Sequence, residues 1–146
     1  MIELVIVIVV IGVLAAVMLP RFFDVGRDAR IANVQALAGA VRTAAEVARM
    51  KWVVSGNNDM GSVALALDSG QQVYFYRGWP DAGNCCNPSG LQDLVDASGF
   101  TVTGLGNTVT QFAPVSAIDS ATCSVRYTEA INPGDRYTLT VTTSGC

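Results

Sequence analysis

The stretch Met1-Ile-Glu-Leu-Val-Ile-Val-Ile-Val-Val-Ile-Gly-Val-Leu-Ala-Ala-Val-Met-Leu-Pro20 decides how this chain is built. As a helix it is about 28 Å long, close to the length that spans a bilayer. Glu3 is its single charged residue, Gly12 interrupts it and Pro20 closes it. A secretory signal peptide would begin with basic residues, so the stretch predicts a membrane anchor or the packed core of a fibre. Because an unpaired carboxylate is costly in an apolar medium, we expect a partner to neutralise Glu3.

The apolar pattern continues beyond Pro20 as one face of a helix over residues 21–54. Apolar residues recur at steps of three and four positions, the period of an amphipathic helix. They are Ile31, Val34, Leu37, Ala38, Val41, Ala44, Ala45, Ala48 and Trp52. A helix that runs to residue 54 is about 80 Å long, whereas the remaining residues form a globule with a radius of gyration of only about 12 Å. Residues 1–20 must therefore project as a transmembrane or filament-core segment, while residues 21–54 pack on the head.

Residues 55–146 are expected to form that head, with antiparallel strands over about residues 72–77, 108–115, 122–128 and 136–142. A short helix is expected over residues 91–97, with Ser89 as its cap. Trp52 and Trp79 are interpreted as packing anchors between helix and sheet, in preference to ligand contacts. The fold class is therefore α+β, with a long N-terminal helix whose apolar half protrudes from a C-terminal antiparallel head.

Composition argues against catalysis and against nucleic-acid binding. The 146 residues include no histidine, the side chain most often used as a general base or metal ligand. The charged fraction is 14% and the formal net charge is −3, so clustered basic residues for nucleic acid are not expected. A glycine-rich phosphate loop is missing as well. We therefore predict a protein that is not an enzyme and binds no cofactor or metal.

Glu3 and the aliphatic run to Pro20 resemble the N-terminal signature of type IV pilins and of type II secretion pseudopilins. The stretch after it, through Pro20-Arg-Phe-Phe-Asp24, Asp28-Ala-Arg30 and Ala44-Ala-Glu46, is most similar to the mannose-sensitive haemagglutinin (MSHA) branch of major pilins. Such proteins are made with a basic leader that a prepilin peptidase removes, which leaves an N-methylated residue four positions before the glutamate. Here only Met1 and Ile2 precede Glu3, so the chain departs from the pattern at its start.

The resemblance implies a structural subunit that polymerises with itself into an extracellular filament for adhesion or motility. The subunit would wait in inner-membrane lipid until an assembly machinery lifts it into a bundle of helices. Glu3 would then pair with the N-terminal amine of a neighbouring subunit. Gly12 and Pro20 would bound a stretch, residues 13–19, that is unwound in the fibre. The alternatives are the major pseudopilin of a type II secretion system and a membrane-anchored binding module.

The four cysteines, Cys85, Cys86, Cys123 and Cys146, predict disulfides and an oxidising compartment. A four-thiolate zinc site is the alternative, which adjacent Cys85 and Cys86 fit poorly. Regular pairing in the last hairpin would place Cys123 opposite Val141, so we expect two bonds that each join the 85/86 loop to Cys123 or Cys146. The C-terminal disulfide loop usual in the family implies instead a bond between Cys123 and Cys146.

Overall fold

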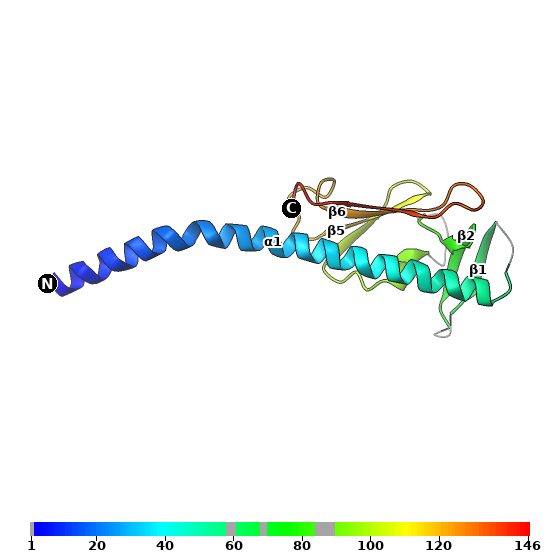
Figure 1. The fold of residues 1–146 in the computed structure, drawn as a ribbon, viewed down its shortest axis with the longest axis horizontal. Helices are drawn as coiled ribbons and strands as arrows, with labels where there is room; N and C mark the ends of the chain where they lie inside the picture. The colour runs from blue at the N-terminus through cyan, green and yellow to red at the C-terminus, as the bar shows by residue number, and fades with distance from the viewer. Residues whose placement is uncertain (1, 58–60, 68–69, 84–89) are drawn as a thin grey trace.

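A computed structural model describes residues 2–57, 61–67, 70–83 and 90–146, and within the first range it leaves the side chains of residues 19–24 undescribed. The chain begins with one long helix, α1 (Ile2–Val54). Its first half stands clear of the rest of the molecule with a gentle curve, and its second half lies along the head (Figure 1). The helix ends at Val54 and is followed by a turn at Ser55 and Gly56. Gly56 has a positive φ of 71°, a conformation that suits glycine.

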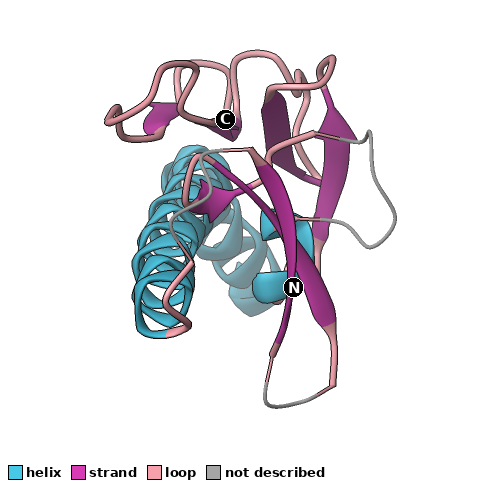
Figure 2. Cartoon of the chain, turned by 90° about the vertical axis from the view of Figure 1, so that its right-hand side faces the viewer, coloured by secondary structure: helices cyan, strands magenta, loops and turns pink. Residues whose placement is uncertain are grey.

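The head contains two antiparallel sheets. The three-stranded sheet consists of β1 (Ser62–Ala66), β2 (Gln72–Tyr76) and β3 (Trp79–Pro80), paired in that order. The four-stranded sheet consists of β4 (Phe100–Gly104), β5 (Val109–Pro114), β6 (Ser124–Thr128) and β7 (Thr138–Thr142), each paired with the next. Figure 2, viewed along the molecule, shows the strands gathered to one side of α1 and above it. The prediction of an α+β chain with a long helix on an antiparallel head is confirmed.

The buried core forms where α1 meets the two sheets. The predicted apolar stripe from Ile31 to Trp52 faces the strands, and each of its members is buried or half-buried. Val34, Val41 and Ala45 pack with Phe112 and Tyr127 of the four-stranded sheet. A second cluster joins the end of α1 to the three-stranded sheet through Ala48, Trp52, Val73 and Phe75. Helical periodicity alone therefore identified the face of α1 that holds the head.

The head differs from the sequence prediction in its short helix and in three of its strands. In place of a helix over residues 91–97 there is a single 3₁₀ turn, η1 (Leu91–Leu94). It stops because Val95 is extended, and its N-cap Gly90 forms no side-chain cap; Ser89 lies outside the described residues. The strands β1, β3 and β4 were not predicted. β1 and β4 alternate exposed and half-buried residues along their length, so period-two patterning was the available signal, whereas β3 has only two residues and shows no pattern.

Candidate assembly surface

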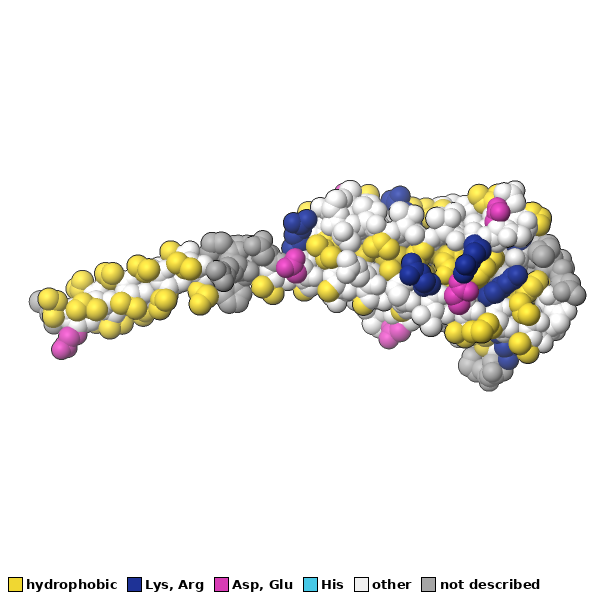
Figure 3. Space-filling view, viewed as in Figure 1, with side chains coloured by type: hydrophobic (Ala, Val, Ile, Leu, Met, Phe, Trp, Pro, Cys, Tyr) yellow, Lys and Arg dark blue, Asp and Glu magenta, His cyan; other side chains and the backbone are white. Residues whose placement is uncertain are grey.

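The projecting half of α1 is an apolar arm, defined here as residues 2–18. Every large apolar side chain from Ile2 to Met18 is at least 50% exposed. Figure 3 shows this arm as a nearly continuous apolar surface beyond the head. Exposed apolar surfaces on monomeric proteins rarely exceed a few hundred Å² unless they bind something. The arm is therefore a surface that calls for a partner.

Glu3 and Gly12 lie on the arm, and Pro20 lies just beyond it. Glu3 is in the first turn of α1 and exposed, with apolar residues on both sides. A side chain added at Gly12 would meet no atom within 4 Å. The backbone is helical through residues 13–19 and through Pro20, although proline supplies no N–H to the helical ladder. The unwinding expected for the assembled fibre is thus not present in the single chain, and for the fibre it stays a prediction.

No helix among the residues whose side chains are described combines the length and the apolar character that crossing a membrane requires. The transmembrane role of residues 1–20 stays a prediction.

The head holds α1 through an aromatic and arginine cluster near the end of the helix. The guanidinium of Arg49 lies over the ring of Trp52, 4.7 Å from its centroid, and over that of Trp79 at 5.2 Å. The ring of Tyr137 packs edge-on against Trp79, with 4.9 Å between centroids. Both tryptophans are buried, so their interpretation as packing anchors is confirmed. These contacts hold the last turns of α1 against the head.

A second attachment joins the two sheets to each other. The residues that follow β3 run past the end of β6, where the amide of Ala82 donates to the carboxylate of Glu129 at 3.2 Å. The hydroxyl of Tyr127 donates to the carbonyl of Pro80 at 2.8 Å. Asp81 lies beside Glu129, and both carboxyl groups are buried. Within the described part of the chain, no three carboxylate or thiol side chains come together as a metal site requires.

The C-terminal residue is tied back to the sheet by a disulfide between Cys123 and Cys146. Our expectation that the 85/86 loop bonds to one of these cysteines is therefore wrong, because each sulfur already has its partner. The register explains the error: Val125, not Cys123, lies opposite Val141. The chain then turns after β7, and the amide of Gly145 donates to the carbonyl of Thr122, which brings Cys146 over the start of β6. Cys85 and Cys86 lie outside the described residues.

Comparison with known proteins gives one partial similarity. Over 51 residues, 35% of this chain, the sequence is 51% identical to the type IV narrow pilus major component PilA5 of Thermus thermophilus. The match spans 44% of that protein, so less than half of the relative is covered. No family model and no solved structure matches the chain. The similarity supports a relationship to type IV pilins.

The fold agrees with that relationship, since a long N-terminal helix followed by an antiparallel head is the expected architecture of a type IV pilin. The sequence prediction missed two groups of residues: the buried carboxyls of Asp81 and Glu129, and the packing of Arg49 on Trp52 and Trp79. Both groups come together only through the packing of the sheets, for which the sequence carries no local signal.

Proposed function

We propose that this protein is the structural subunit of a type IV pilus-like filament and that its role is polymerisation, not catalysis. The observation that carries the proposal is the exposed apolar arm, residues 2–18, which continues without interruption into the helix of a folded head. Helices that are apolar on all sides are stable only when lipid or other helices cover them. A bundle of such arms, with the heads outside, covers each arm with its neighbours and gives an extracellular fibre.

Glu3 supplies the specific contact in this proposal. In the single chain it is exposed, but in a bundle of arms the same carboxylate is surrounded by aliphatic side chains. Burying a charge is tolerable only when an opposite charge accompanies it. The N-terminal amine of a neighbouring subunit is the partner that we propose, because it lies at the same end of the same kind of arm. Their pairing then sets the axial register between subunits.

Before assembly, the same arm needs another cover, and we propose the lipid of the inner membrane. Processing of the chain and its transfer from the membrane into the fibre require two further partners, a prepilin peptidase and a pilus assembly machinery. Within the family, we propose an MSHA-like major pilin that serves adhesion or motility, on the strength of the residues between Pro20 and Glu46. The narrow-pilus relative supports the broader class of pilus subunits.

Electron microscopy of fibres sheared from expressing cells tests the proposal, with antibodies against the head as the label. We expect long fibres that carry the label along their length. Short stubs that form only on overexpression would instead identify a pseudopilin, and label that remains on membranes without any fibre would identify an anchored binding module. Cells that lack the protein are the control for fibres built from other subunits.

A further inference from the structure

A positively charged groove of about 400 Å³ lies beside α1, on the flank next to β7. Arg42 and Arg136 line it, together with the half-buried side chains of Tyr137 and Leu139. Glu46 is its one acidic member and forms an ion pair with Arg136. None of the described residues forms a hydrogen bond or ion pair with the exposed guanidinium of Arg42. The groove therefore presents a positive charge to solvent beside apolar surface, and Figure 3 shows basic groups gathered around an acidic one on this face.

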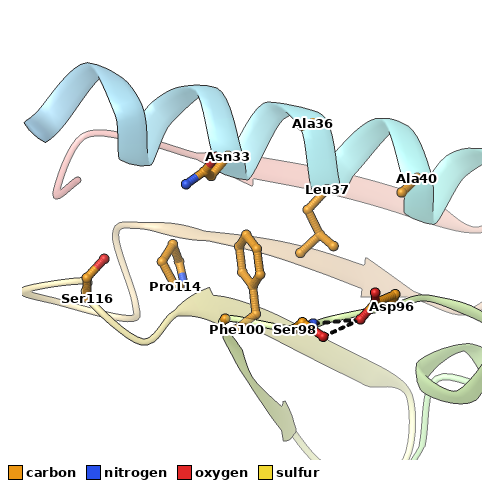
Figure 4. Close-up of a pocket in the computed structure, with 10 residues that line it drawn as sticks. Asn33, Ala36, Leu37, Ala40, Asp96, Ser98, Phe100, Pro114 and Ser116 are labelled. Atoms are coloured by element: carbon orange, nitrogen blue, oxygen red, sulfur yellow. Dashed lines mark hydrogen bonds between the residues drawn. The ribbon is translucent and has the colours of Figure 1, made fainter. Parts of the chain in front are cut away.

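An acidic turn, residues 96–99, lies on the opposite flank of α1. The carboxylate of Asp96 is exposed and accepts hydrogen bonds from the amide of Ser98 at 3.0 Å and from its hydroxyl at 2.6 Å (Figure 4). These hydrogen bonds lower the pKa of Asp96, so its negative charge is retained at neutral pH. Gly99 has a φ of 82°, and a Cβ at this position would meet nothing within 4 Å. The turn is therefore stabilised by its own hydrogen bonds, carries a negative charge and has open space around Gly99.

The helix itself separates the two surfaces. Each residue of an α-helix is rotated by about 100° from the one before it. Ala40 and Arg42 therefore lie on opposite sides of Val41, which is fully buried against the head. Ala40 lines the hollow next to the acidic turn, and Arg42 lines the basic groove. A contact between two unlike surfaces on opposite flanks of one molecule would be heterologous, the type of contact that can repeat along a filament.

We propose that the 96–99 turn of one subunit enters the basic groove of a second copy of this chain, where Asp96 pairs with Arg42. The inference rests on the proposed function and names the surface through which neighbouring heads recognise each other. Opposite charge on the two surfaces supports it. The groove volume also lies within the range of about 300–1,000 Å³ that is common for binding pockets. Such a charge pair selects the neighbour and its register more than it adds affinity.

Charge reversal with rescue tests the proposal in the full-length chain. Arg42→Glu and Asp96→Lys each place like charges at the contact, so we expect either substitution to lower the yield of sheared fibres at least about tenfold. The double variant restores opposite charges with exchanged positions, and we expect its yield to return to within about twofold of wild type. Single variants with normal yield, or a double variant no better than the singles, would overturn the proposal.

The chain offers matched controls for both substitutions. Asp119 is also exposed and accepts hydrogen bonds from the next turn, through Ala121 and Thr122, but it lies on the β5–β6 loop and outside both surfaces. Asp119→Lys should leave the fibre yield unchanged. Arg42→Lys keeps the charge at the contact, so it should still give fibres, in contrast to Arg42→Glu. Asp96→Asn can still accept the Ser98 hydrogen bonds, so a loss of fibres in this variant reports the charge and not the fold of the turn. Normal yield from Asp96→Asn would contradict the charge pairing.

Cross-linking separates failure of this contact from failure of the proposed function. Fibres of the Arg42→Lys variant, treated with a carbodiimide, should yield a peptide that joins position 42 to Asp96. The two positions are on opposite flanks of α1, so such a product forms between subunits. Fibres that assemble but give no such product refute the contact and leave the proposed function standing. Absence of fibres from the wild-type protein refutes both.

Discussion

The carboxyl groups of Glu129 and Asp81 lie beside each other in the interior of the head, where β3 and β6 both end. Burial, chiefly, raises the pKa of Glu129 to about 7 from its ordinary 4.5, and the neighbouring Asp81 raises it further, against the opposing effect of the Ala82 amide. Below that pH a protonated Glu129 can donate to Asp81. Above it, Glu129 carries a negative charge beside the buried carboxyl group of Asp81, away from water, at the junction of the two sheets.

This pair predicts that the head loses stability as the pH rises toward neutrality. A carboxyl group whose pKa is raised by folding stabilises the protein fully below about pH 4.5, and this stabilisation is lost as the pH rises through about 7. Glu129→Gln removes the titration and keeps the hydrogen bonds. We expect the variant to be more stable than wild type by about 2–3 kcal/mol at pH 8, with little difference at pH 5. Denaturant unfolding at several pH values measures this.

Asp119→Asn is the control for the pH experiment. Hydrogen bonds from Thr122 and Ala121 lower the pKa of Asp119, so this carboxylate contributes stability that is lost only as the pH falls into the acid range. Its substitution should not change how the free energy of unfolding varies between pH 5 and pH 8. If the stability of Glu129→Gln follows the wild-type pH dependence over this range, the buried acid pair is not its cause.

The disulfide of the C-terminus leads to a second prediction. It closes a loop with a sequence separation of 23, and both cysteines are buried. Loops of that size lose about 3 kcal/mol of unfolded-state entropy when they are closed. We expect Cys146→Ser to lower the free energy of unfolding by about that amount, as measured by denaturant. Non-reducing peptide mapping should recover linked peptides that contain Cys123 and Cys146.

Substitution of the other cysteines completes that test. A variant in which Cys85 and Cys86 are both replaced by serine should retain the mapped 123–146 bond. In the wild-type protein, a peptide that joins Cys123 to Cys85 or Cys86 would restore the pairing that we expected from the sequence alone.

Patterns of short period along the chain predicted most of the fold. The stripe of α1 was visible because Val34, Leu37 and Val41 follow the helical repeat, and this repeat directly determines which side is buried. The alternation of Tyr137, Leu139 and Val141 identified the last strand for the same reason. The class α+β follows from these elements, since a single long helix and several strands leave few ways to form one core.

Features that depend on how elements meet could not be predicted in this way. The pairing of β6 with β7 differs by two positions from the register that we expected. This register, together with the turn at Gly145, decides the partner of Cys146. The meeting of Asp81 and Glu129 depends on how two sheets are placed against each other. The groove between Arg42 and Arg136 likewise needs the packing of β7 beside α1. Each is a tertiary relationship between residues that no local sequence motif marks.

Glu3 provides a third prediction, which concerns assembly. Glu3→Gln and Glu3→Ala should leave the head folded and lower the yield of fibres strongly, by at least about tenfold, because the register-setting charge pair is lost. Glu3→Asp keeps the charge and should retain part of the yield. Quantitative blotting of sheared fibres measures the effect, with circular dichroism as the control for folding. Normal fibre yield from Glu3→Ala would remove Glu3 from the assembly mechanism.

Pro20 provides a fourth prediction, which concerns the fibre backbone. Proline in a helix interior removes one hydrogen bond and costs about 3 kcal/mol, and Gly12 lowers helix propensity by about 1 kcal/mol. We expect residues 13–19 to be extended or irregular in the assembled fibre, where contacts between subunits compensate for lost helix. Pro20→Ala should restore helical backbone there and make the fibre less extensible in force measurements. A continuous helix through these residues in a fibre of the wild-type protein would contradict the prediction.

The division of α1 into arm and head-bound half leads to the last prediction. The large apolar side chains of residues 2–18 are exposed, whereas packing on the core begins at Ile31 and Val34. A chain that starts at Arg21 should therefore be monomeric in size-exclusion chromatography and unfold with a free energy within about 1 kcal/mol of the full chain in detergent.

A chain that starts at Val34 is the control. It lacks Ile31 and the contact between Arg30 and the carbonyl of Cys146, so we expect it to lose about 2–4 kcal/mol. Aggregation of the longer truncation would mean that the head depends on its arm, and that the arm is not solely an assembly element.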